Sequence, residues 1–173
     1  LIDLLPESIS KDPELVRAFE SAAERLISIR HPNVNQVLDF GKANGRSYLV
    51  RQYDEGISLA EVLHRKKQLE PEQAARIFAL AFAGLQAIHE KQSQGGDLGA
   101  GNIFLAEMGK GRKGRTIKIL RPGLSASLFV EGAFRKPEEV VPTLRPLSRP
   151  EDDLFHLGQS FYEALSGKTC RAT

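Results

Sequence analysis

The chain has 173 residues, of which 41% are apolar and 27% charged, and its formal net charge is +2. This length is enough for one domain with a sizeable core, and a charge so close to zero gives no indication of a nucleic-acid or membrane partner. The single cysteine, Cys170, excludes an internal disulfide and a multi-cysteine zinc site, so we expect a reducing, cytoplasmic compartment. Since no apolar run approaches about 18 residues and no basic-then-apolar leader opens the chain, we expect neither a membrane span nor a signal peptide within it.

The first part of the chain predicts a strand, a helix and a β-hairpin. Residues 1–5 form a short apolar run closed by Pro6, which is typical of the end of a strand. Asp12 and Pro13 then supply an N-cap and a first helical residue. The apolar residues that follow recur on one face of a helix: Leu15, Phe19, Ala22, Leu26 and Ile29. Two strand candidates, 34–41 and 47–53, are joined by an Asn-Gly turn signal.

The middle of the chain predicts two helices and two short strands. Ser58 and Glu61 form a capping box that opens a short helix through about Lys66. Pro71 opens a longer helix with a continuous apolar stripe: Ala74, Ile77, Phe78, Ala81, Leu85 and Ile88. The strand candidates 103–105 and 117–120 enclose a literal G-x-G-x-x-G, but because a strand rather than a helix follows it, we interpret it as a basic hairpin tip.

The last part of the chain predicts a long irregular segment and a helix. Residues 123–149 are rich in proline, glycine and serine without a clear period. Asp152 and Asp153 then cap an amphipathic helix that stops at Gly167.

The segment 95–105 places Asp97 and Asn102 five residues apart, after the long helix and before a short apolar strand. This order resembles the catalytic loop of protein kinases, H-R-D-L-x-x-x-x-N followed by a strand. The resemblance implies that Asp97 stands at the position of the catalytic base and Asn102 at that of the metal-binding asparagine. Three glycines replace the histidine, the arginine and the lysine that Ser/Thr kinases carry in this loop: Gly95, Gly96 and Gly99.

The similarity to protein kinases extends over nearly the whole chain. His31-Pro32-Asn33 follows the first helix as in many kinases, residues 54–56 match the hinge between the lobes, and Lys136-Pro137-Glu138 resembles the A-P-E that closes an activation loop. The resemblance implies an α+β, two-lobed protein-kinase-like fold. We expect a truncated small lobe over residues 1–54 and a partial helical large lobe over residues 55–173.

Two departures from the family pattern concern the groups that hold the nucleotide phosphates. If residues 4–6 align as in V-A-I-K-V-L-P, Asp3 replaces the third-strand lysine and sets an anion against anions. The glutamate that pairs with this lysine falls at Ala22, counted back from the histidine of the H-P-N sequence. Glu20 and Glu24 are two positions away, so at roughly 100° per residue they point some 200° from the required face.

A third departure concerns the metal. The D-F-G sequence of kinases appears here as Arg121-Pro122-Gly123, so the magnesium-binding aspartate is an arginine. At about 4 Å and an effective dielectric constant near 20, a unit-charge pair is worth roughly 4 kcal/mol, and a dication doubles this. Exchanging attraction for repulsion is expected to abolish metal-assisted transfer, although Arg121 could instead contact phosphate or Asp97 directly.

Further departures concern the arrangement of the lobes and the nucleotide pocket. Gly95 and Pro122 remove two rings from the hydrophobic column that joins the lobes in kinases. Arg51, followed by Gln52 and Tyr53, stands where kinases keep the gatekeeper behind the adenine. Its side chain could fill the pocket, pair with a nearby carboxylate, or turn outward from an edge strand.

The retained polar residues admit a structural interpretation. Asp97 and Asn102 could hold the turn of the loop without any substrate, as loop aspartates and asparagines often do. We expect Asp152 or Asp153 to act as the helix-start aspartate that bonds the catalytic-loop backbone in kinases.

These observations favour a pseudokinase domain, a binding or regulatory module within a signalling protein. We expect a protein partner, no nucleic-acid or membrane partner, no bound metal and no cofactor. One alternative is a divergent Ser/Thr protein kinase that retains weak Mg-ATP-dependent transfer through Asp97. Another is a nucleotide sensor that binds without metal or transfer.

Overall fold

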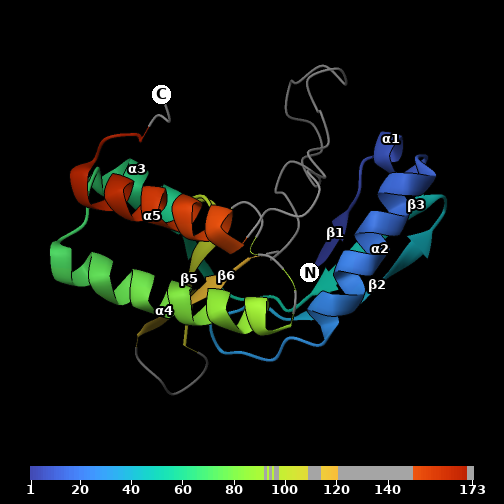
Figure 1. Ribbon diagram of the computed structural model, residues 1–173, viewed down its shortest axis with the longest axis horizontal. Helices are drawn as coiled ribbons and strands as arrows, with labels where there is room; N and C mark the ends of the chain where they lie inside the picture. Colours follow the sequence, from blue (N-terminus) through green and yellow to red (C-terminus); the bar gives the residue numbers. More distant parts are fainter. Residues whose placement is uncertain (92, 94, 96–97, 109–113, 121–149, 171–173) are drawn as a thin grey trace.

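The computed structural model describes residues 1–91, 93, 95, 98–108, 114–120 and 150–170. These ranges contain two three-stranded antiparallel sheets and five helices. The N-terminal sheet has the strand order β1-β3-β2, and the C-terminal sheet has the order β4-β5-β6. In Figure 1 the N-terminal sheet lies with α1 and α2 on one side of the molecule, while α3, α4 and α5 lie on the other.

The N-terminal sheet consists of β1 (Ile2–Leu4), β2 (Val37–Ala43) and β3 (Arg46–Arg51). β1 pairs with β3 so that Asp3 lies opposite Leu49. Asn44 and Gly45 both have positive φ, at 50° and 78°, which is the conformation that a tight hairpin turn requires. The predicted hairpin is therefore confirmed.

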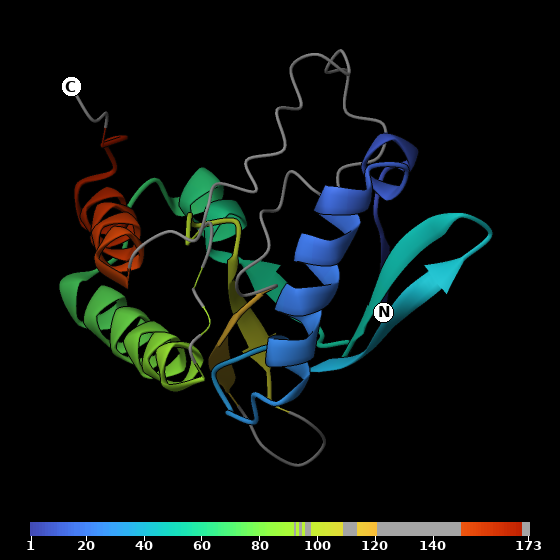
Figure 2. The same ribbon diagram turned by 45° about the vertical axis from the view of Figure 1, so that its right-hand side comes forward.

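Two helices accompany this sheet, α1 (Glu7–Ser10) and α2 (Pro13–Ile27). The carboxylate of Asp12 accepts hydrogen bonds from the backbone N–H groups of the first turn of α2, which satisfies donors that have no partner within the helix. α2 lies against the N-terminal sheet (Figure 2), where the rings of Phe19 and Phe40 meet edge to face at 6.4 Å. The apolar face predicted from the spacing is the buried face.

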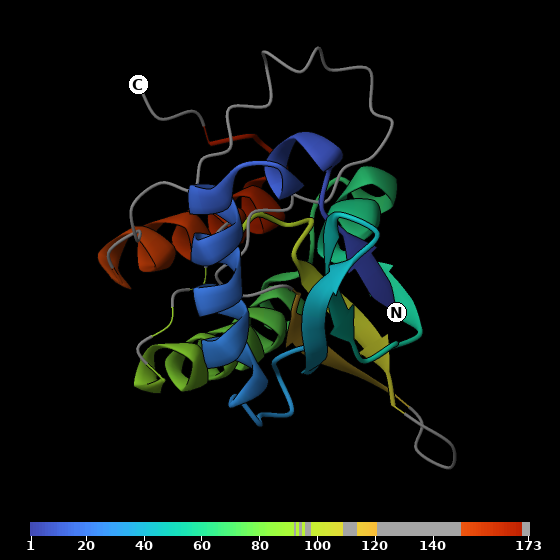
Figure 3. The same ribbon diagram turned by 90° about the vertical axis from the view of Figure 1, so that its right-hand side faces the viewer.

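The C-terminal part contains β4 (Gly56–Ser58), α3 (Leu59–Lys66), α4 (Pro71–Glu90), β5 (Ile103–Glu107), β6 (Arg115–Ile119) and α5 (Pro150–Ser166). The predicted capping box of α3 is present, and the backbone hydrogen bond from Ser58 lowers the pKa of Glu61. α5 ends at Ser166 and is followed by Gly167, whose φ of 66° suits a glycine stop. Figure 3, in which the N-terminal part faces the viewer, shows α4 and α5 behind it.

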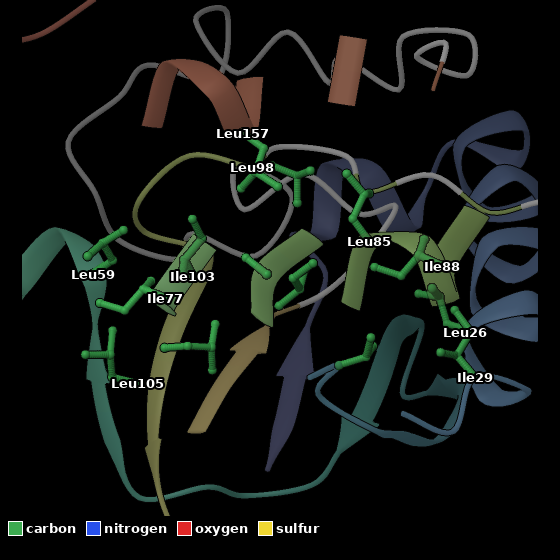
Figure 4. Close-up of a cluster of buried hydrophobic side chains, with 14 of the residues drawn as sticks. Leu26, Ile29, Leu59, Ile77, Leu85, Ile88, Leu98, Ile103, Leu105 and Leu157 are labelled. Carbon is green, nitrogen blue, oxygen red and sulfur yellow. The ribbon is translucent and has the colours of Figure 1, made fainter. Parts of the chain in front are cut away.

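One apolar core runs through both parts of the chain. The predicted stripe of α4 is fully buried within it, and the rings of Phe78 and Phe161 join α4 to α5 at 4.8 Å. Figure 4 shows side chains from α2, α3, α4, β5, α5 and the loop before β5 within this cluster. Gly84 lets α4 approach the turn after α2, because a Cβ atom there would lie 2.5 Å from the carbonyl oxygen of Asn33.

Most predicted elements are confirmed, with three differences. α1 and β4 were not predicted, because each is a single short turn or strand without a period of its own. The strand expected from residue 34 begins only at Val37, since Val34 instead forms a parallel bridge with Ile119 of β6. The division into two lobes near residue 54 stays a prediction.

Within the described residues, no helix is long and apolar enough to cross a membrane.

Candidate functional site

The loop that follows α4 is fixed at its start by Asp153. This carboxylate is completely buried in the first turn of α5. Its Oδ2 accepts hydrogen bonds from the backbone N–H of Gly95 and from Nε2 of His89, both at 2.8 Å. Of the two aspartates expected to bond this loop, Asp153 makes the bond to Gly95, whereas Asp152 is exposed.

The second half of the loop is held by three neighbouring elements. Ser160 of α5 donates to the carbonyl oxygen of Leu98 at 3.1 Å, and the N–H of Ala60 in α3 donates to that of Ala100 at 3.0 Å. Asn102 is buried, its N–H bonds the carbonyl of Gly99 at 2.9 Å, and its carbonyl accepts from the N–H of Leu120 at 2.8 Å. The described part of the loop is thus tied to α3, α5 and the end of β6.

A side chain at Gly95 would require neighbouring leucine side chains to move. A Cβ atom at this position would lie 2.6 Å from Cδ1 of Leu98 and 2.9 Å from Cδ1 of Leu85. Both leucines are fully buried, and Figure 4 shows Leu98 beside Leu157 of α5. The position at which kinases carry a histidine is therefore closed by apolar packing.

Asp3 and Arg51 form a buried ion pair between neighbouring strands. Nε of Arg51 lies 2.5 Å from Oδ2 of Asp3, and the two side chains are only 9% and 10% exposed. Asp3 lies opposite Leu49, two residues before Arg51, so both charged side chains are on the same face of the sheet. The outward orientation considered for Arg51 is wrong, because its pairing with a carboxylate buries it.

A second ion pair, which is part-buried, gave no signal in the sequence. Nζ of Lys118 in β6 lies 2.6 Å from Oδ1 of Asp54, in the segment between β3 and β4. Nδ2 of Asn35 donates to Oδ2 of Asp54 at 2.8 Å and to the carbonyl oxygen of Gln52 at 3.1 Å. No local sequence signal connects Asn35, Asp54 and Lys118, because they lie far apart along the chain.

The other residues predicted for the nucleotide pocket are differently placed. Ala22 is buried in α2, as the apolar spacing predicts. Gln52 is exposed, and its Nε2 donates to Asp54 at 3.3 Å. Tyr53 is 66% exposed, so most of its ring faces solvent.

Several predicted positions lie outside the described residues. These include two positions of the catalytic-like loop and two of the segment matched to D-F-G: Gly96, Asp97, Arg121 and Pro122. The irregular segment 123–149, with its A-P-E-like sequence, and the tip 109–113 also lie outside them. Their assignments stay predictions.

No metal site is found in the part of the chain that the structure describes, where no three His, Cys, Asp or Glu side chains gather. An open groove lies elsewhere, on the face formed by α4 and α5, and its lining mixes apolar and polar side chains: Phe82, Leu85, Gln86, His89, Glu90 and Leu154. It shares no residue with the two ion pairs, although His89 also contacts Asp153 and Leu85 lies beside Gly95.

Comparison with known proteins assigns the family. Residues 10–172 match the protein kinase domain, so the chain belongs to the protein kinase domain family. It is 26% identical over 178 residues to the serine/threonine-protein kinase PrkC of Bacillus subtilis and 24% identical over 181 residues to PknB of Mycobacterium leprae. Each alignment covers 96% of this chain but only 26% and 28% of those proteins, so the chain spans about a quarter of their length.

Solved structures confirm the expected protein-kinase fold. The kinase domain of Mycobacterium tuberculosis PknI superposes with a TM-score of 0.77 at 17% identity, and a single-residue mutant of that domain superposes with a TM-score of 0.78. These alignments cover 99% of this chain, and 63% and 65% of the two solved chains. The α+β kinase fold is thus established for a chain shorter than those domains.

Proposed function

We propose that this chain is a pseudokinase domain that acts as a binding or regulatory module for a protein partner and needs no Mg-ATP. The observation that carries the proposal is the buried Asp3–Arg51 ion pair. If Asp3 stands at the position of the phosphate-binding lysine, the cation that could replace the lysine is already used to neutralise Asp3.

Recruiting Arg51 to a nucleotide would break its ion pair with Asp3, in which both side chains are largely buried. Breaking a buried pair by removing one partner typically costs about 3–5 kcal/mol. A ligand bound at micromolar affinity has a binding free energy of only about −8 kcal/mol, so this cost would weaken binding by a factor of roughly 100 or more. The surroundings of the ion pair therefore disfavour phosphate.

The catalytic-like loop supports the same conclusion. The histidine of the kinase loop is Gly95 here, and a Cβ atom at this position would lie 2.6 Å from Cδ1 of the buried Leu98. Together with Ala22 and Arg121 in the sequence, these features support loss of phosphoryl transfer with retention of the fold.

A phosphate-transfer assay tests the proposal. The full chain and its Asp97→Asn variant are incubated with radiolabelled ATP, magnesium and a generic protein substrate. We expect no transfer above background from either protein. Transfer by the wild type that falls at least about a hundredfold in Asp97→Asn would instead establish the divergent-kinase alternative, because the substitution removes the group that accepts the hydroxyl proton.

A further inference from the structure

The two ion pairs meet at a single asparagine. Nη1 of Arg51 lies 3.5 Å from Oδ1 of Asn35, and Nδ2 of Asn35 donates to Oδ2 of Asp54 at 2.8 Å. Oδ1 of Asp54 in turn accepts from Nζ of Lys118 at 2.6 Å. A continuous series of polar contacts therefore runs through Asp3, Arg51, Asn35, Asp54 and Lys118, and we call these five residues the Asn35 relay.

The relay crosses from one sheet to the other. Asp3 and Arg51 belong to β1 and β3 of the N-terminal sheet, whereas Lys118 belongs to β6 of the C-terminal sheet (Figure 1). Backbone bonds accompany it, since the N–H of Asn35 donates to the carbonyl of Ile119 at 2.9 Å. A displacement at the N-terminal end of the relay thus has a physical route to β6.

The residues of the relay are largely shielded from solvent, which strengthens their electrostatic contacts. Asn35 is 1% exposed, and the side chains of Asp54 and Lys118 are 11% and 12% exposed. In such an environment water and salt screen charges weakly, and hydrogen bonds that share a group polarise one another. Each cation of the relay contacts an anion, so breaking either pair would separate opposite charges in a largely buried environment.

We propose that the Asn35 relay is a conformational coupling device between the two sheets. A charged group of a protein partner that competes for Arg51 would change the Asp3–Arg51 pair. Through Asn35 this change alters the ion pair between Asp54 and Lys118. β6 ends next to Asn102, whose carbonyl accepts the N–H of Leu120, so the change reaches the catalytic-like loop. This inference stands on contacts within the chain and does not depend on the absence of catalysis.

A double-mutant cycle on the full chain tests the coupling. Asp3→Asn and Lys118→Met are made singly and together, and the equilibrium constants for unfolding in urea are compared. Each single variant changes the equilibrium constant for unfolding by some factor. If the relay couples the two ends, the factor measured for the double variant is smaller than the product of the two single factors by at least about threefold, as is typical of residues in one network. A product reproduced to within about twofold would show that the pairs are independent and overturn the proposal.

A matched control uses an ion pair outside the relay. Lys11 and Glu7 form an exposed pair in and beside α1, with a separation of 2.6 Å. Asp3→Asn combined with Lys11→Met is expected to give the product of the single effects. If both double variants deviate equally from the product of their single effects on the unfolding constant, the deviation comes from the unfolded state or from general destabilisation. That result would also overturn the proposal.

Hydrogen exchange provides a second readout that does not require the single variants to fold. Replacing the whole pair, Asp3→Leu with Arg51→Met, removes both charges together, a change that buried pairs often tolerate. We expect the amide of Ile119, which donates to Asn33 at 2.9 Å, to exchange at least threefold faster, while amides in the middle of α4 stay unchanged. An unchanged rate at Ile119 would contradict the coupling even if nucleotide never binds.

Discussion

The carboxylate of Asp153 accepts a hydrogen bond from the backbone N–H of Gly95 at 2.8 Å and so joins the first turn of α5 to the catalytic-like loop. The same oxygen lies 2.8 Å from Nε2 of His89, at the end of α4. A single buried carboxylate thus fixes the relative positions of two helices and a loop. Its contacts within the chain give Asp153 an architectural role.

Asp153→Asn should destabilise the fold by about 2–3 kcal/mol, because hydrogen bonds to a charged group are worth about 1.5–3 kcal/mol each and the new amide presents N–H groups to existing donors. Urea denaturation measures the change. Glu151→Gln is the matched control, since this side chain in the same turn is exposed and its loss should cost no more than about 1 kcal/mol. Equal effects at the two positions would show that the bond to Gly95 does not hold the loop.

Gly95→Ala should also destabilise, by about 1–3 kcal/mol, because the new methyl group would press on the buried side chains of Leu98 and Leu85. Gly101→Ala offers a control in the same loop, where a Cβ atom has nothing within 4 Å. That change should be neutral or slightly stabilising, since alanine loses less conformational freedom on folding. Thermal or urea unfolding of the two variants compares them directly, and a neutral Gly95→Ala would contradict the closed packing.

Two glycines within helices, Gly158 and Gly84, show whether helix propensity or packing decides the effect of a substitution by alanine. Alanine is favoured over glycine inside a helix by about 1 kcal/mol, so Gly158→Ala in α5, where space is open, should stabilise by up to this amount. Gly84→Ala should destabilise despite the same gain, because its Cβ would meet the backbone oxygen of Asn33 at 2.5 Å. Melting temperatures that rise in both variants would mean that α4 and the turn after α2 are less closely packed than described.

Much of this architecture can be predicted from the sequence. The caps at Asp12 and at Ser58 with Glu61, the Asn-Gly turn and the apolar stripe of α4 are local signals, and each appears in the structure. Local signals suffice there because neighbouring residues alone decide a cap, a turn or a helical face. By contrast β4 exists only through its pairing with β5, in which Gly56 lies opposite Ala106.

The candidate site could be predicted only in part. The sequence named Asp3 and Arg51 as departures, but it named no partner for either, because their contact depends on the register between β1 and β3. Asn35 and Lys118 gave no signal at all, since a lone polar residue in a loop or strand is most often solvated. Their roles follow from tertiary packing that brings residue 35 within bonding distance of residue 54, and residue 54 within that of residue 118.

The Asp3–Arg51 pair yields a further prediction about stability. Arg51→Met alone should cost about 3–5 kcal/mol, because it removes one partner of a largely buried ion pair. Asp3→Leu with Arg51→Met should recover most of this loss, since apolar replacements of a buried pair are often neutral or stabilising. Both variants can be compared by urea denaturation at neutral pH. A double variant no more stable than Arg51→Met would contradict the assignment of the loss to the broken Asp3–Arg51 pair.

The most direct measurement for the central claim, that the chain keeps the kinase fold without using nucleotide, is a thermal-shift titration of the full chain with ATP, with and without magnesium. Ligand at a hundredfold over its dissociation constant stabilises the folded state by about 2.7 kcal/mol, which for a chain of this size corresponds to a rise of roughly 5–10 °C. The account predicts no rise in melting temperature under either condition. A magnesium-dependent rise of that size would contradict it and favour a divergent kinase, and a rise without magnesium would contradict it in favour of a nucleotide sensor.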